Sequence, residues 1–238
     1  MRIIDRWVGI PLCFFASFWP LKKAQADSNS TLATNIPPPD TIVFILIAEI
    51  GALVVAYPAI KETRKQHPKS RICFITAPAG LQTLELMGFE KEDIFLLETS
   101  SIKSLLKGIV NIRSHFKGRR VSAIVLEPFT RFSTLLSAWI GASKRIGCYR
   151  FLNEGVYLGN ILTHRLVYNP HLHMSQTYFA LAKALIEPDS AKPLLKEYIP
   201  SQIKNRLKIN IPEKERQTLM KRLQSECPEN PLKEIFHA

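Results

Sequence analysis

The sequence lacks most of the features that assign a function directly. Its 4 cysteines are scattered along 238 residues (Cys13, Cys73, Cys148 and Cys227), with no C-x-x-C pair. A disulfide framework or a zinc site is therefore not expected, and a reducing compartment is the simplest setting. The chain also has no G-x-G-x-x-G, G-x-x-x-x-G-K-[ST] or G-x-S-x-G motif, which leaves a dinucleotide site, a P-loop and a serine hydrolase without support. We expect no metal and no cofactor.

Acidic residues are in short supply, and the chain carries a formal charge of +12 from 32 Lys and Arg against 20 Asp and Glu. Such an excess favours an anionic partner. The basic residues interleave with expected helices and are not accompanied by a regular pattern of aromatics, which single-stranded nucleic-acid binding would need. We therefore expect an acidic membrane surface or a phosphorylated ligand as partner, and no nucleic acid.

No apolar run reaches the roughly 20 residues of a membrane-spanning helix. The longest, Trp7–Leu21, contains two prolines and is followed by Lys22–Lys23. Three readings stay open: a segment lying in the membrane interface, a signal peptide cleaved near residues 24–26, or a buried packing segment. We take the first, with residues 1–26 as a membrane-interface segment.

A proline-rich linker is expected over residues 27–40, and strands then alternate with helices. The strands are expected at Ile42–Ile47, Arg71–Thr76, Asp93–Leu97, Val121–Leu126 and Arg145–Gly147, and the helices at Ala52–Gln66, Gly80–Met87, Ser101–Phe116, Arg131–Ile140 and Ser175–Leu185. This alternation predicts an α/β fold, a Rossmann-like parallel sheet covered on both faces, over residues 41–186. Residues 187–238 read as a connector and a truncated C-terminal region.

Ligands of open parallel sheets bind beyond the carboxyl ends of the strands. That rule selects the turns Ala48–Ala52 and Glu127–Arg131, which both enter helices. Glu49 follows six apolar residues, where burial would raise the pKa of its carboxyl and suit it to act as a base. The alternative is a first-turn acid that complements the helix dipole. Glu127 stands in the same relation to its strand, with an i,i+4 ion pair to Arg131 as its alternative.

Several segments, in order and spacing, resemble one enzyme family. They are Phe44–Ile60, His67-Pro68, Ile140–Gly147 and Thr163-His164. Together they are similar to the heptosyltransferases, glycosyltransferase family nine, with coverage of about Ile4–Leu185. The stretch Asp5–Cys13 resembles the start of a membrane-proximal branch of that family.

The resemblance implies the N-terminal, acceptor-binding half of a two-domain GT-B fold, with the C-terminal donor domain apparently missing. Such enzymes transfer a sugar from a nucleotide-sugar donor to a lipid-linked envelope glycan acceptor, as in lipopolysaccharide biosynthesis. Transfer inverts the anomeric centre, and a first-turn carboxylate deprotonates the acceptor hydroxyl. The implied location is peripheral, at the cytoplasmic face of the bacterial inner membrane.

The usual base of the family, an Asp directly after the turn glycine, corresponds here to Ala52. We therefore expect Glu49, three residues earlier, to be the catalytic residue. Substrate-binding residues are expected at Gly51, Ala52, Glu127, Arg131, Thr163 and His164. The alternative function is that of a non-catalytic, membrane-associated binding or scaffold remnant of such an enzyme.

Overall fold

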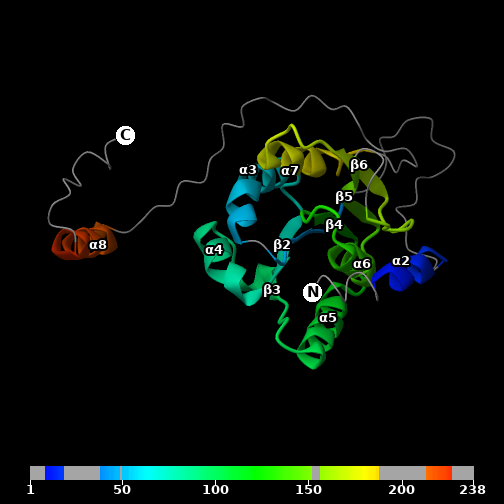
Figure 1. Ribbon diagram of the computed structural model, residues 1–238, viewed down its shortest axis with the longest axis horizontal. Coiled ribbons are helices and arrows are strands. Elements are labelled where there is room, and N and C mark those ends of the chain that lie inside the picture. The colour runs from blue at the N-terminus through cyan, green and yellow to red at the C-terminus, as the bar shows by residue number, and fades with distance from the viewer. Residues whose placement is uncertain (1–8, 19–37, 49, 152–155, 188–212, 227–238) are drawn as a thin grey trace. The chain divides into compact units, whose positions relative to one another are not determined.

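A computed structural model describes residues 9–18, 38–48, 50–151, 156–187 and 213–226 (Figure 1). The chain divides into two compact units, residues 1–207 and 208–238. The described part of the second unit is the helix α8 (Glu213–Glu226), whose residues are mostly exposed, as expected for a surface helix. The domain limits expected from the sequence stay predictions, because most of them fall outside the described residues.

The first unit is built on a six-stranded parallel sheet, which confirms the expected α/β class. The strands are β1 (Thr41–Ile45), β2 (Arg71–Thr76), β3 (Ile94–Leu96), β4 (Val121–Val125), β5 (Lys144–Phe151) and β6 (His164–Tyr168). Their order across the sheet is β3-β2-β1-β4-β5-β6. In the central strands Val43 lies opposite Cys73 on one side and Ala123 on the other. The central strands are mostly apolar because each has a neighbouring strand on both sides and both of its faces are buried.

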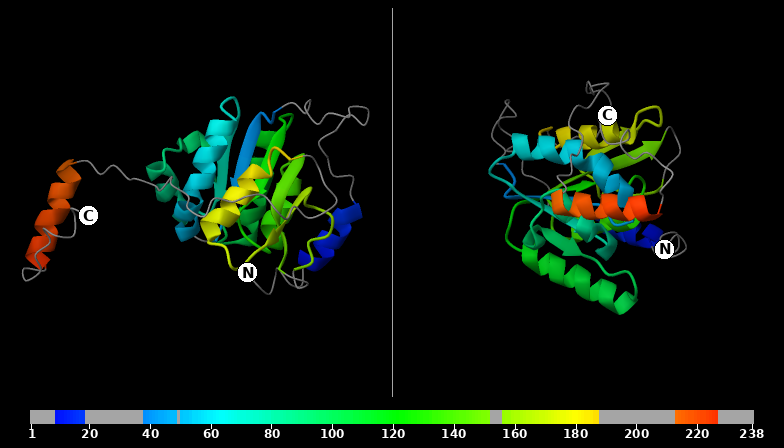
Figure 2. Two further views of the ribbon diagram at one scale, coloured as in Figure 1. Left: turned by 90° about the horizontal axis from the view of Figure 1, so that it is seen from above. Right: turned by 90° about the vertical axis from the view of Figure 1, so that its left-hand side faces the viewer.

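Helices cover both faces of the sheet. On one face lie α3 (Ile50–Gln66), α4 (Leu81–Leu86) and α7 (Met174–Lys183), and on the other lie α5 (Ile102–Phe116) and α6 (Arg131–Trp139). The right-hand view of Figure 2 shows α3 and α7 on one side of the sheet and α5 on the other. The helix α2 (Gly9–Phe18) packs against α6. Two 3-10 turns, η1 (Pro78–Gly80) and η2 (Lys91–Asp93), complete the connections.

The side chains of β1 show how the two cores arise. Ile42 and Phe44 point into the core beneath α3 and α7, whereas Val43 and Ile45 point into the core beneath α5 and α6. The alternation follows from the period of two residues along a strand. Burial raises the pKa of the Cys73 thiol to about 12, as it does for Cys148, so neither thiol is reactive at neutral pH.

Local signals explain the helix ends. Ser101 caps α5, because its hydroxyl accepts a hydrogen bond from the amide of Ser104 at 3.1 Å. His173 caps α7 in the same way, accepting from the Ser175 amide at 3.2 Å, while the Gln176 side chain accepts from the His173 amide at 3.0 Å. This capping box gives one of the two histidines near α7 an ordinary structural role.

Two strands differ from the expectation. β5 is longer than Arg145–Gly147, and β6 was not expected at all. Both sequences carry cations inside the strand pattern, and Arg145 is buried because its guanidinium donates to the carbonyls of Ile161 and Ala142 at 2.6 Å and 2.5 Å. A charge whose partners are distant carbonyls leaves no periodic signal in the sequence. None of the helices in the described ranges combines the length and apolarity that crossing a membrane requires.

Candidate functional site

The chain reverses direction across the sheet between β1 and β4. These strands are neighbours, yet α3 leaves β1 toward one face and α6 leaves β4 toward the other. In doubly wound sheets ligands bind at such a switch point, beyond the carboxyl ends of the strands. The two turns singled out from the sequence therefore follow neighbouring strands at this switch point.

Glu127 ties these two turns together. Its carboxylate, with the residue only 8% exposed, accepts hydrogen bonds from the amide of Ile47 at 2.8 Å and of Ala48 at 2.7 Å. A third donor is the hydroxyl of Ser133 in the first turn of α6. The bonds described for the carboxylate thus go to the β1–α3 turn and to Ser133, rather than along the helix to Arg131. Glu127 fixes the backbone that leads directly to Glu49.

Glu49 itself lies outside the described residues, so the base assignment stays a prediction. Gly51 sits in the first turn of α3, exposed, and a side chain placed there would meet no atom within 4 Å. Ala52, next in sequence, is packed in the core with Leu53. The turn therefore presents an open helix N-terminus at Gly51 and a buried methyl group at Ala52.

Arg131 and Phe129 shape the second turn. Arg131 is buried, and its Nε donates to the carbonyl of Tyr157 at 3.1 Å. Phe129 has a φ of 59°, in the left-handed region that non-glycine residues rarely adopt. Its ring packs edge-to-face on Tyr168, at the carboxyl end of β6, with centroids 5.5 Å apart. Such backbone strain is concentrated at functional sites, and the sequence carried no signal for it.

Thr163 and His164 are buried where β6 begins. His164 is the first residue of β6, where it lies opposite Ile146 of β5. His164 is fully buried, with one ring nitrogen 2.8 Å from the Thr163 hydroxyl and the other 2.9 Å from the carbonyl of Glu187. These contacts give both residues a part in the packing of the domain, and their role in substrate binding stays a prediction.

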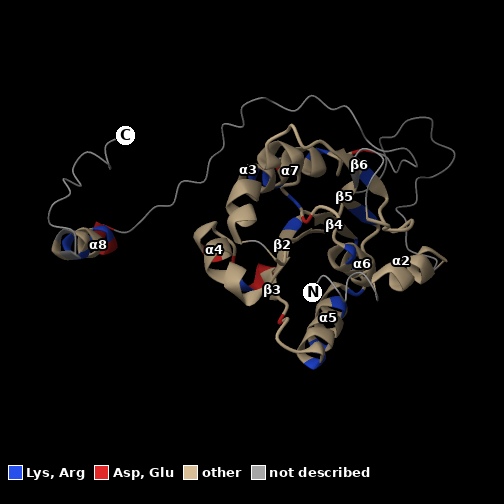
Figure 3. Ribbon diagram, viewed as in Figure 1, with Lys and Arg blue, Asp and Glu red and all other residues tan. Residues whose placement is uncertain are grey.

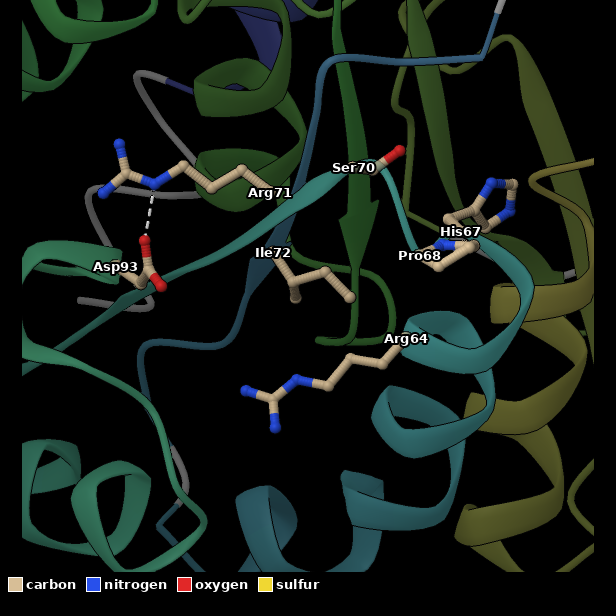
Figure 4. Close-up of a pocket in the computed structure, with 7 residues that line it drawn as sticks. All are labelled: Arg64, His67, Pro68, Ser70, Arg71, Ile72 and Asp93. Carbon is tan, nitrogen blue, oxygen red and sulfur yellow. Dashed lines mark hydrogen bonds and ion pairs between the residues drawn. The ribbon is translucent and has the colours of Figure 1, made fainter.

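A cavity of about 290 Å³ lies at the start of β2 (Figure 4). This is the side of the sheet on which the parallel strands begin, here called the amino edge; the carboxyl edge is the side on which they end. Two of its polar groups are bound to the protein: Arg71 Nε is 2.5 Å from the Asp93 carboxylate, and the Ser70 hydroxyl donates to the carbonyl of Pro39 at 2.6 Å. The Nε2 atom of His67 is buried without a hydrogen-bond partner among the described residues. Figure 4 shows the Arg71 guanidinium pointing to Asp93, on the side away from His67. Groups that do not converge make this cavity a poor candidate for a ligand site.

The switch point can supply two kinds of interaction. The first turns of α3 and α6 offer backbone N–H groups that favour an anionic oxygen. The carboxylate of Glu127 holds the amides of Ile47 and Ala48 at the end of β1. In the described part of the chain, no group of three or more His, Cys, Asp or Glu could hold a metal ion. The helix N-termini can bind an anionic ligand oxygen.

Comparison with known proteins agrees with this architecture. Neither a known protein family nor a curated protein sequence matches the chain. Among solved structures it is similar to a family 9 glycosyltransferase from Veillonella parvula, with a TM-score of 0.54 and 17% identity over 79% of this chain and 50% of that one. The fold resembles one half of a glycosyltransferase.

Two further likenesses are weaker. The E. coli heptosyltransferase WaaC with ADP-2-deoxy-2-fluoro heptose gives a TM-score of 0.49 and 9% identity over 64% of this chain and 50% of that one. The same enzyme with ADP gives 0.48 and 8% over 64% and 49%. The chain therefore spans about half the length of each structure that it resembles.

Proposed function

We propose that this chain is the acceptor-binding half of an inverting glycosyltransferase of the heptosyltransferase kind. The observation that carries the proposal is the likeness of its six-stranded sheet to half of a family 9 glycosyltransferase. The acceptor is a lipid-linked envelope glycan such as a lipopolysaccharide precursor, held at the switch point. The donor is a nucleotide-sugar, bound by a separate donor domain. The enzyme would then work at the cytoplasmic face of the bacterial inner membrane, as a peripheral protein.

The proposed chemistry is one displacement. The acceptor hydroxyl oxygen attacks the anomeric carbon, the bond to the nucleoside diphosphate breaks, and the diphosphate leaves with the electron pair. The proton passes to the carboxylate of Glu49. Support for this role comes from Glu127, whose bonds to the amides of Ile47 and Ala48 fix the backbone just before Glu49. A general base must be correctly positioned, as well as have a suitable pKa, to remove the proton.

The direct test is sugar transfer with and without the proposed base. Labelled nucleotide-sugar and extracted envelope glycolipid are incubated with the chain and a donor domain, and product is followed by chromatography. We expect Glu49→Gln to abolish transfer while glycolipid binding persists. Glu98→Gln is the matched control, because Glu98 is an exposed carboxylate after another strand of the same sheet. Undiminished transfer by Glu49→Gln would remove Glu49 from the mechanism.

Calorimetry separates the acceptor half from the donor half. Nucleotide-sugar titrated into this chain should bind no tighter than the millimolar range, about −4 kcal/mol. Glycolipid should bind more tightly than that. Micromolar binding of the nucleotide-sugar would assign this sheet to the donor side instead.

One observation favours a second candidate, a non-catalytic binding or scaffold protein. Ala52 stands where the family carries its base, and its methyl group is packed in the core. In that case glycolipid binding would be retained, and no transfer would follow even when a complete donor domain is supplied. The transfer assay described above therefore decides between the two candidates.

A further inference from the structure

The helix α2 packs on the domain through its smallest residues. Gly9 and Cys13 are buried, and Ser17 follows four residues later on the same side of the helix. The Ser17 hydroxyl donates to the carbonyl of Cys13 at 2.7 Å and accepts a hydrogen bond from the amide of Asn160 at 3.0 Å. The side of α2 that carries these small residues is thus hydrogen-bonded to the loop that precedes β6.

Gly159 makes this attachment possible. A Cβ atom at this position would lie 2.0 Å from the Ser17 hydroxyl oxygen and 2.7 Å from the carbonyl oxygen of Cys13. Gly159 also has a φ of 59°, a conformation that glycine adopts without strain. Only a residue without a side chain allows the helix to approach so closely, so the position of α2 is specified by the sequence on both sides of the contact.

The opposite side of α2 is large, apolar and exposed. Phe15 and Phe18 are 68% and 74% exposed, and Ile10, Leu12 and Phe14 are exposed as well. A helix on a water-facing surface normally buries its large apolar residues and exposes its small or polar ones. α2 has the reverse arrangement, which is stable only where its outer side meets another apolar phase.

The helix α5, which covers the same face of the sheet as the α6 helix under α2, carries the same kind of surface. Ile102, Leu106 and Val110 are exposed along one side of it, with Ile102 72% exposed. Three exposed cations accompany them: Lys103, Lys107 and Arg113. The helices α2, α5 and α6 contain no Asp or Glu at all, whereas acidic residues occur in α3 and α4 on the other face (Figure 3). Apolar helix surfaces that carry cations and no acidic residue match the interface of an acidic membrane.

We propose that the outward sides of α2 and α5, the α2–α5 surface, dock the protein on an acidic lipid bilayer. α2 lies in the plane of the interface with its phenylalanines among the acyl chains, and the cations of α5 contact anionic headgroups. Charge argues for lipid over a second copy of the chain, because a symmetric contact would bring the acid-free surfaces of two proteins of net charge +12 together. The proposal does not depend on sugar transfer.

Vesicle flotation of the full chain tests the docking. Vesicles of phosphatidylcholine are compared with vesicles that also contain phosphatidylglycerol. We expect binding only to the second kind, weakened by salt. The triple variant F14S/F15S/F18S should bind at least tenfold more weakly. The triple variant K103Q/K107Q/R113Q should bind more weakly at low salt and lose its salt dependence.

Matched variants on the other face provide the control. Val54→Ser, Leu86→Ser and Lys61→Gln change exposed residues of the same types on α3 and α4, and they should leave flotation unchanged. Thermal unfolding of every variant shows whether the fold persists. Equal flotation of the native chain and F14S/F15S/F18S would overturn the proposal. So would sedimentation that shows a dimer abolished by that variant, since the surface would then join two copies. Either result leaves the transfer assay unaffected.

Discussion

The two edges of the sheet differ in how they use their polar groups. At the amino edge, charged side chains bind one another or backbone carbonyls: Arg120 pairs with Asp40 at 2.6 Å, and the buried Lys144 amino group donates to the carbonyls of Leu185 and Glu187 at 3.0 Å and 2.9 Å. At the carboxyl edge, Glu127 holds backbone amides, and Phe129 is kept in a left-handed conformation.

The difference teaches that a charged cluster is no guide to the site in this fold. The amino edge has a cavity and the buried cations Lys144 and Arg145, which donate to backbone carbonyls of the domain. The carboxyl edge has the buried Glu127 and Arg131, with backbone amides held by Glu127 and open space around Gly51. Substitutions at one edge that leave the other unchanged should therefore show which edge affects stability alone and which also affects ligand binding.

The largest effect is expected at Glu127. Glu127→Ala leaves the buried amide of Ile47 and its neighbour Ala48 without their acceptor, and each such group costs about 1–3 kcal/mol. We expect a loss of about 3 kcal/mol in the free energy of unfolding, measured by urea denaturation. Hydrogen exchange of the Ile47 and Ala48 amides should accelerate more than that of amides in β2.

The matched control is Glu98→Ala, which removes an exposed carboxylate after β3 and should change stability by less than about 0.5 kcal/mol. Glu127→Gln keeps one acceptor oxygen and should fall between the two. A Glu127→Ala protein as stable as the control would mean that the turn does not need this carboxylate.

Lys144 tests the opposite edge. Lys144→Met keeps the length of the side chain but removes the amino group that binds the end of α7. Hydrogen bonds from a charged donor are worth about 1.5–3 kcal/mol, so we expect a loss of about 2 kcal/mol with glycolipid binding unchanged. Lys69→Met, at an exposed position near the same edge, should be nearly neutral. A Lys144→Met protein that loses glycolipid binding while staying folded would place ligand contacts at the amino edge.

Much of the fold could be predicted from the sequence. The strands β1, β2 and β4 are mostly apolar, and two of the helices have recognisable signals at their ends, Ser101 before α5 and Gly141 after α6. β6 could not be predicted, because His164 and Arg165 interrupt its pattern and because His164 is buried against the distant carbonyl of Glu187. The local sequence pattern predicts a strand correctly when both of its faces are buried among apolar residues. It fails when a charged or polar residue is buried through contacts with other parts of the fold.

The candidate site was only partly predictable. The rule for parallel sheets selected both turns, and it placed Glu127 correctly beside the β1–α3 turn. It could not show that the carboxylate binds amides 79 and 80 residues away, because such pairs have no sequence signature. For His164, only the resemblance suggested substrate binding, and its burial beside Thr163 and the carbonyl of Glu187 had no signal in the sequence.

Gly51 and Ala52 allow a smaller, sharper comparison within the carboxyl edge. Gly51→Asp adds a carboxylate in open space at the start of α3, where the helix dipole favours it by about 0.3–1 kcal/mol. Ala52→Asp adds the same group where the methyl is packed, and we expect a loss of about 1 kcal/mol. Thermal unfolding measures both. Equal stability of the two variants would show that position 52 is open to solvent.

The smallest effect concerns pH and returns to the amino edge. Burial lowers the pKa of His67 below its ordinary value of 6.5, and the nearby charge of Lys144 lowers it further. The unfolded chain therefore binds more protons than the folded one just below pH 6.5, so stability falls as pH drops through that range. Burial and the neighbouring Arg119 and Arg71 lower the pKa of His115 in the same direction.

We expect His67→Asn to flatten the dependence of unfolding free energy on pH between about 7 and 5, leaving a residual slope from His115. The paired carboxylate of Asp40, whose pKa is lowered by Arg120 from 3.8, contributes only at lower pH and does not disturb this window. Urea denaturation at each pH gives the slopes. Identical slopes for the native chain and His67→Asn would show that His67 reaches solvent in the folded state. The amino edge would then be less tightly closed than its contacts indicate.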